Sequence, residues 1–189
     1  MQRVKTYLAL GDSMSIDDYT GVRGGGAVNQ FLQTLGKNWA LDDRTFDGCL
    51  MAAVPENGRG DLITLTIGGN DLLWNRDKYL REGIDDFQRE HAELLAKIRR
   101  ENPPALFIVG DIYEPALPLS NAELRGLSAA NAAIHKNSEQ VQAVVAPIHD
   151  TFQGRSHEFL CLAIEPTLLG ASAIAKLFAD AYQRNHRQS

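Results

Sequence analysis

The stretch Asp61–Asp71, with the sequence DLITLTIGGND, joins a short apolar run to a polar turn. Its segment Leu62–Ile67 is short, apolar and rich in β-branched residues, which is typical of a strand buried on both faces. Two glycines end the run, and an amide and a carboxylate follow at Asn70 and Asp71. Ligands bind beyond the carboxyl ends of the strands in open parallel sheets, so this strand exit is a candidate for function.

Similar apolar runs on either side of this stretch predict the remaining strands. They are Val4–Leu10, Ala105–Val109, Val141–Ile148 and a weaker one near Thr45–Phe46. Helical patterns separate the strands. An apolar stripe runs from Ile84 to Ile98 and ends before Pro103-Pro104. Ser120 and Glu123 form a capping box for a helix that runs to about Gln140, and a last apolar stripe runs from Ile174 to Tyr182. This alternation predicts an α/β domain with a mostly parallel, doubly wound sheet.

Composition agrees with one globular domain over residues 1–189, because 44% of the residues are hydrophobic and 23% are charged. The 24 acidic and 19 basic side chains give a net charge of −5, which provides no general attraction for nucleic acid. No apolar run reaches the ~18 residues of a membrane span. The first ten residues are too polar for a signal peptide, so we expect a cytoplasmic protein with a small-molecule substrate. The pattern leaves the oligomeric state open.

Ser13 lies directly after the first predicted strand, in the sequence Gly11-Asp12-Ser13-Met14-Ser15. A serine hydroxyl becomes a nucleophile when a base takes its proton and hydrogen-bond donors stabilise the oxyanion that forms. The side-chain amide of Asn70, at the exit of a neighbouring strand, is a candidate donor. Taken singly, each segment is also compatible with an ordinary turn, since Ser, Asn and Asp often cap helices.

Taken together and in this order, the two segments resemble those of the SGNH (GDSL) hydrolase family. The resemblance extends from residue 4 to about 180 and includes the segment Val109–Pro115. It implies a flavodoxin-like α/β/α three-layer sandwich with a mostly parallel five-stranded sheet, and it implies hydrolysis of esters without a cofactor or metal. It maps the nucleophile onto Ser13, the oxyanion-binding amide onto Asn70, and a second oxyanion donor, a backbone N–H, onto Gly48.

The chain departs from that family near its C-terminus. Members normally carry Asp-x-x-His-Pro, whereas this chain has Leu162-Ala163-Ile164-Glu165-Pro166. Glu165 therefore replaces the catalytic histidine, and Leu162 replaces the aspartate that orients it. A glutamate is ordinarily the weaker base by about two pKa units, or roughly 3 kcal/mol of driving force. We expect an apolar pocket formed by Leu162, Leu168 and Leu169 to raise the pKa of Glu165 and restore part of that basicity.

Several alternatives remain open for the base and for the function. His157 or His149 could replace Glu165 as the base, or the serine could be uncatalytic, leaving an SGNH-like binding protein. Arg44 could pair with Glu165 or with a substrate anion. A less favoured hypothesis is a metal-dependent phosphoesterase, whose Mg²⁺ would be held by the acidic side chains near Ser13 and Asn70, although these follow no established metal-binding spacing. The acids in question are Asp12, Asp17, Asp18 and Asp71.

Two further features carry weaker predictions. Cys49 and Cys161 lie far apart in the sequence and imply neither a disulfide framework nor a zinc site, although each adjoins a segment mapped to the site. The glycine-rich run 21–26 suggests a loop that lets a substrate approach or lets a lid move.

Overall fold

The computed structural model describes residues 3–55 and 57–186, and its centre is a parallel sheet of five strands in the order β2-β1-β3-β4-β5. The strands are β1 (Lys5–Gly11), β2 (Trp39–Thr45), β3 (Leu62–Thr66), β4 (Leu106–Gly110) and β5 (Val144–Ala146). This strand order is the flavodoxin-like one, with the chain reversing direction across the sheet between β1 and β3. The predicted fold class is confirmed.

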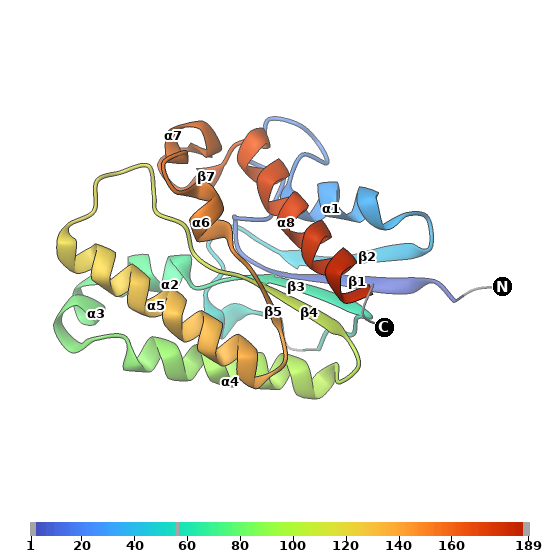
Figure 1. Cartoon of the computed structure of the whole chain (residues 1–189), viewed down its shortest axis with the longest axis horizontal. Coiled ribbons are helices and arrows are strands. Elements are labelled where there is room, and N and C mark those ends of the chain that lie inside the picture. The colour runs from blue at the N-terminus through green and yellow to red at the C-terminus, as the bar shows by residue number, and fades with distance from the viewer. Residues whose placement is uncertain (1–2, 56, 187–189) are drawn as a thin grey trace.

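Helices cover both faces of the sheet (Figure 1). One face carries α1 (Ala27–Leu35), α6 (Ile148–Phe152), α7 (Ser156–Phe159) and α8 (Leu168–His186). The other carries α2 (Gly69–Trp74), α3 (Arg76–Glu82), α4 (Asp85–Glu101), α5 (Asn121–Gln140) and the short 3-10 helix η1 (Met51–Ala53). A small antiparallel hairpin, β6 (Leu160–Cys161) with β7 (Glu165–Pro166), precedes α8.

Each strand contributes to two hydrophobic cores because successive side chains point to opposite faces of a sheet. In β1, Tyr7 and Ala9 pack against α1 and α8, whereas Leu8 and Leu10 pack in the core beneath α4 and α5. Strands buried on both faces contain near-continuous apolar runs. This is why β1, β3 and β4 are recognisable in the sequence to within a residue or so.

The two edge strands differ from their predicted positions. The prediction of a strand at Thr45–Phe46 found only the end of β2, because this edge strand carries Asp42, Asp43 and Arg44 and lacks an apolar run. The predicted strand Val141–Ile148 is reduced to Val144–Ala146, because the turn that follows α5 and the start of α6 take its flanks.

Helix starts follow the predicted capping signal where one exists. At α5 the Ser120 hydroxyl accepts a hydrogen bond from the Glu123 N–H at 3.3 Å, and the Glu123 carboxylate accepts one from the Ser120 N–H at 2.7 Å. This reciprocal pair is the predicted capping box. Within the residues that the structure describes, no helix is both long and apolar enough to cross a bilayer.

The glycine-rich run 21–26 is a packed loop. The Asp17 carboxylate accepts hydrogen bonds from the N–H groups of Gly24 and Gly26 at 2.6 and 2.7 Å. Gly25 and Gly26 are buried, and a Cβ on Gly26 would approach the backbone of Ile16 to 2.5 Å. Close packing therefore accounts for these two glycines, in place of the mobility that the sequence suggested.

Candidate active site

Ser13 stands at the carboxyl end of β1, where a close approach of two strands fixes its backbone. The N–H of Asp12 donates to the carbonyl oxygen of Thr66 at 2.9 Å. Gly11 has φ +125°, and a Cβ there would lie 1.9 Å from that same oxygen, so only glycine fits. The Ser13 side chain is buried and lines a cavity at the edge of the sheet.

Glu165 reaches Ser13 because the β6–β7 hairpin folds back over the end of the sheet. Glu165 pairs with Cys161 across the hairpin and is only 7% exposed. Burial raises the pKa of its carboxyl group, a hydrogen bond from the Ser13 hydroxyl lowers it, and the negative charge of Asp47 raises it; the net pKa lies above the ordinary value. The Oε2 atom is buried without a hydrogen-bond partner among the described residues. The carboxylate therefore has a free acceptor beside the hydroxyl.

The predicted leucine pocket around Glu165 is wrong. Leu162, Leu168 and Leu169 are 76%, 42% and 51% exposed, so they do not enclose the carboxylate. The hairpin turn directs Leu162 outward, because it adopts a left-handed conformation with φ +48°. Burial at the edge of the sheet raises the pKa of Glu165 instead. The backbone next to Glu165 is fixed by Tyr113, whose buried hydroxyl donates to the Ile164 carbonyl.

Asn70 and Asp71, at the start of α2, hold the loop that contains Gly48. The Asn70 amide donates to the Cys49 carbonyl at 3.1 Å, and the Asp71 carboxylate accepts from the Met51 N–H at 3.2 Å. A primary amide has two N–H groups, so Asn70 keeps a second donor after binding Cys49. Gly48 directly precedes the carbonyl that Asn70 holds, and it is exposed with φ +70°. The structure thus brings the two predicted oxyanion donors into one neighbourhood.

Asp12 is a second buried carboxyl group beside Glu165. Its pKa is raised to about 8, chiefly by burial and further by the charge of Glu165, against the lowering effect of hydrogen bonds from Met14 and Thr66. The Met14 N–H donates to Asp12 Oδ1 at 3.2 Å, which closes the turn around Ser13. Asp12 is consequently neutral at pH 7 and adds no negative charge beside Glu165.

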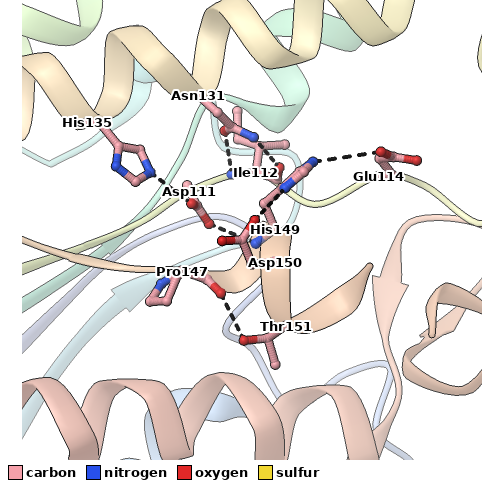
Figure 2. Close-up of polar contacts among 9 residues, drawn as sticks. All are labelled: Asp111, Ile112, Glu114, Asn131, His135, Pro147, His149, Asp150 and Thr151. Carbon is pink, nitrogen blue, oxygen red and sulfur yellow. Dashed lines mark hydrogen bonds and ion pairs between the residues drawn. The ribbon is translucent and has the colours of Figure 1, made fainter. Parts of the chain in front are cut away.

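Both histidines predicted as spare bases have other partners, and Figure 2 shows those of His149 beside His135. The backbone N–H of His149 donates to the buried Asp111 carboxylate at 2.8 Å, and its ring nitrogens face Asp150 at 3.2 Å and Glu114 at 3.7 Å. The Nε2 of His135 contacts the second oxygen of Asp111 at 3.0 Å. His157 is 76% exposed and faces Glu158. Among the described residues, no histidine has Ser13 as a polar partner.

Other polar residues predicted for the site bind other partners or are exposed. Arg44 binds Asp42 of its own strand at 2.8 Å and does not pair with Glu165. Asp17 is engaged by the loop that follows it, while Asp18 is exposed. Within residues 3–55 and 57–186, no three or more His, Cys, Asp or Glu side chains are arranged to hold a metal ion. The phosphoesterase hypothesis therefore gains no support from these acids.

Both cysteines are free thiols close to the site. Burial, with smaller contributions from the charges of Asp12 and Asp71, raises the pKa of Cys49 to about 12, so its thiol stays protonated. The Cys161 thiol donates to the backbone carbonyl of Glu165 at 3.4 Å. The two cysteines thus pack around the site, Cys49 as a protonated thiol beside the Gly48 loop and Cys161 in the hairpin.

A cavity of about 370 Å³ extends from Ser13 and Asn70 between α2, α3 and α5. Its walls are mainly apolar, and the sequence analysis did not identify them. Two of the three helices are α2 and α3, with six and seven residues, which are too short for a clear helical period. The sequence does carry one signal for these apolar walls, a group of leucines that follows Asn70 at positions 72, 73 and 80.

Comparisons with known proteins place this fold. No protein-family model matches the sequence, and no curated protein matches it. Among solved structures, a lipase from a goat rumen metagenome superposes with a TM-score of 0.78 at 20% identity, covering 94% of this chain and 97% of that one. A member of the lipolytic G-D-S-L family from Veillonella parvula has a TM-score of 0.74 at 15% identity, covering 95% of this chain and 98% of that one.

A variant of an acetyl xylan esterase from Geobacillus stearothermophilus gives a TM-score of 0.72 at 14% identity, covering 95% of this chain and 94% of that one. At these identities the likeness concerns the fold. The chain has the fold of the GDSL lipases and esterases over nearly its whole length, which confirms the structural side of the resemblance seen in the sequence.

Proposed function

We propose that this chain is a serine-dependent hydrolase of small esters, with Ser13 as the nucleophile and Glu165 as its base. The observation that carries the proposal is the contact between the Ser13 hydroxyl and a buried carboxylate whose pKa is raised. A fold shared with lipases and an acetyl xylan esterase supports the reaction class. Asn70 and Gly48 then serve as the oxyanion donors.

The first half of the reaction transfers the acyl group to the enzyme. Glu165 accepts the Ser13 proton while Oγ bonds to the ester carbonyl carbon, and the carbonyl oxygen becomes an oxyanion. The second N–H of the Asn70 amide and the backbone N–H of Gly48 donate to that oxyanion. As the tetrahedral intermediate collapses, the bond to the alcohol breaks, and protonated Glu165 returns its proton to the leaving oxygen.

The second half releases the acyl group by the same steps. Water takes the place of the alcohol, and Glu165 accepts a proton from this water while the water oxygen bonds to the acyl carbon. The carbonyl oxygen becomes an oxyanion again and binds the same two donors. Collapse breaks the bond to Ser13 Oγ, which recovers its proton from Glu165, and a carboxylic acid leaves. One carboxylate thus serves as base and acid in both halves.

The basicity of Glu165 limits the rate. An ordinary glutamate would be less basic than histidine by about two pKa units. Burial of Glu165 reduces this deficit by disfavouring the charged form. Neutral Asp12 helps in a different way, since a second buried negative charge would hinder formation of the oxyanion.

The test is hydrolysis of p-nitrophenyl acetate and butyrate by the wild-type protein and by the variants Ser13→Ala and Glu165→Gln. We expect both substitutions to abolish most of the activity, because each removes one partner of the proton transfer. Activity that survives Ser13→Ala would refute the nucleophile. Activity that survives Glu165→Gln would remove Glu165 from the mechanism and return attention to the histidines.

The replacement of histidine by a weaker base also favours a second candidate, a binding protein that keeps the oxyanion pocket without turnover. Labelling with an organofluorophosphonate separates the two functions, since only an activated serine reacts readily. We expect labelling of the wild-type protein at Ser13 and slower labelling of Glu165→Gln. An unlabelled wild-type protein would favour the binding function.

A further inference from the structure

We propose that the cavity beside Ser13 binds the acyl chain of the ester, and that it selects an unbranched chain of roughly eight carbons over acetyl. This inference rests on the proposed function, because Ser13 and Asn70, which line the cavity, are assigned to the reacting carbonyl. It names the substrate class that the hydrolase would take: medium-chain acyl esters.

The walls of the cavity match an aliphatic chain. Leucines from α2 and α3 form one side, and residues after β4 and on α5 form the other. The apolar lining includes Leu72, Leu73, Tyr79, Leu80, Ile112 and Leu127. Leu73 and Leu80 are 50% and 40% exposed, although residues of their size usually bury more of their surface. An acyl chain between these walls would cover apolar surface that now faces water.

The position of the base decides which half of the ester enters. Glu165 must return its proton to the leaving alcohol, so the alcohol lies on the Glu165 side of the reacting carbon. The cavity is lined by Ser13 and Asn70, whereas Glu165 and Gly48 are absent from its lining. The acyl chain, which stays on Ser13 after the alcohol leaves, is therefore the half that extends into the cavity.

Small residues on α5 keep the cavity open. Ala122, Gly126 and Ala129 all line it, and a Cβ built on Gly126 meets no atom within 4 Å. At roughly 30 Å³ for a methylene-sized group, a cavity of about 370 Å³ holds on the order of a dozen non-hydrogen atoms. An acetyl group would leave most of that space unfilled.

An ion pair holds the two sides of the cavity together at its edge. Arg76 of α3 contacts Glu123 of α5 at 2.6 Å, and both residues belong to the lining. Because the two charges neutralise each other, this part of the edge offers no net charge to a bound chain. The ion pair connects α3 and α5, and an acyl chain would lie between these two walls.

The first experiment compares kcat/KM for p-nitrophenyl esters from acetate to decanoate. Each methylene transferred from water to an apolar site changes an equilibrium about fourfold. We expect kcat/KM to rise about 250-fold over the four methylenes from butyrate to octanoate and to level off beyond it. A matched series of acetates with lengthening alcohols should show no comparable rise. Equal rates for acetate and octanoate, or a rise with alcohol length only, would overturn the proposal while leaving the hydrolase intact.

The second experiment fills the cavity. Gly126→Leu introduces a side chain into open space on a helix, where leucine is the better helix former. We expect the ratio of kcat/KM for octanoate to that for acetate to fall at least tenfold in Gly126→Leu and less in Gly126→Ala. The control is Ala132→Leu, at an exposed position of α5, which should leave the ratio unchanged. An unchanged ratio in correctly folded Gly126→Leu would contradict the cavity's role.

A binding measurement separates this inference from the proposed function. Octanoate is titrated into Ser13→Ala and into the double variant Ser13→Ala/Gly126→Leu, neither of which needs to turn over an ester. We expect binding to the first and at least tenfold weaker binding to the second. If the wild-type protein hydrolyses no ester and yet this difference is seen, the hydrolase proposal fails and the chain-binding cavity stands. If octanoate binds equally to both variants or to neither, the cavity proposal fails.

Discussion

The carboxylate of Glu165 interacts with the hydroxyl of Ser13, although β1 and the β6–β7 hairpin lie near opposite ends of the chain. This contact explains how the site tolerates Leu162 at the position of an orienting aspartate. A histidine base needs a partner to fix its tautomer and its ring, whereas the two oxygens of a carboxylate are equivalent. Glu165 therefore needs no orienting partner at position 162, where the exposed Leu162 lies.

The pH dependence of activity should report on Asp47. If Glu165 is the base, activity should rise with pH as Glu165 loses its proton. The midpoint of this rise should lie above the ordinary glutamate value because burial, and secondarily the charge of Asp47, raises the pKa of Glu165. Asp47→Asn keeps an acceptor for the Tyr19 hydroxyl, which donates to Asp47 at 2.9 Å. Removal of the charge should lower the pKa of Glu165, so activity should persist to lower pH. The measurement is kcat/KM for p-nitrophenyl acetate against pH.

Two comparisons make the Asp47 result specific. Asp85→Asn removes an exposed charge at the start of α4 and should leave the midpoint in place. High salt should shrink the difference between the wild-type protein and Asp47→Asn, because salt screens charges near the surface. A midpoint that does not move in Asp47→Asn would mean that the activity does not titrate with Glu165.

Asn70→Ala should lower kcat by about 100- to 1,000-fold with little change in KM, because an oxyanion donor acts mainly in the transition state. The substitution also releases the Cys49 carbonyl, to which Asn70 donates at 3.1 Å. Initial rates over a range of substrate concentrations give both constants. Asn121→Ala, at an exposed position in the first turn of α5, is the control and should retain wild-type kcat. A large rise in KM with unchanged kcat would instead assign Asn70 to ground-state binding.

The sequence pattern could predict that Ser13 and Asn70 lie near each other, because each follows a predicted strand and parallel strands present their carboxyl ends at one edge of the sheet. Gly48 is assigned by the family resemblance, and it follows β2 at the same edge. The contact of Glu165 with Ser13 could only be hypothesised from the resemblance, because a short hairpin carries Glu165 to the sheet and has no sequence period of its own.

The environment of Glu165 and the cavity could not be predicted for a related reason. Leucines adjacent to Glu165 in the sequence suggested an apolar pocket, yet the left-handed turn at Leu162 and Ala163 directs the first of them to solvent. The cavity is made by residues from α2, α3 and α5 and from the segment after β4. Such a surface depends on how distant elements pack, which single-sequence patterns do not encode.

Asp12 should make the folded protein less stable as the pH rises. Its pKa is about 8 in the folded state, chiefly through burial, against an ordinary value of 3.8. Between these values the folded chain keeps the proton that the unfolded chain has lost, so the free energy of unfolding falls with pH, by a few kcal/mol across the window. Asp12→Asn should flatten this decline, since an amide mimics the neutral acid and can still accept from the Met14 N–H.

Urea unfolding at pH 5 and pH 8 measures the effect of Asp12. The wild-type protein should lose more stability than Asp12→Asn between the two conditions. Asp18→Asn, which changes an exposed acid a few residues away, should behave like the wild-type protein. If Asp12→Asn and the wild-type protein lose the same free energy, Asp12 does not carry a raised pKa.

Gly11→Ala should destabilise the fold more than Gly21→Ala or Gly126→Ala. The added Cβ would lie 1.9 Å from the Thr66 carbonyl oxygen, on a residue with φ +125°. The chain could relieve this overlap only by separating β1 from β3 and losing the bond from the Asp12 N–H to that oxygen. Overpacking, backbone strain and the lost hydrogen bond together cost about 4 kcal/mol.

Two other glycines calibrate the effect of Gly11→Ala. Gly21→Ala meets the same left-handed preference, with φ +70°, but nothing lies within 4 Å, so it should cost only about 1 kcal/mol. Gly126→Ala lies in a helix with open space around it and should stabilise the protein by up to about 1 kcal/mol. Thermal and urea unfolding would rank the three. Because Ser13 follows Gly11 by two residues, the rate of fluorophosphonate labelling should fall in Gly11→Ala alone; labelling at the wild-type rate would show that the β1–β3 junction does not position the nucleophile.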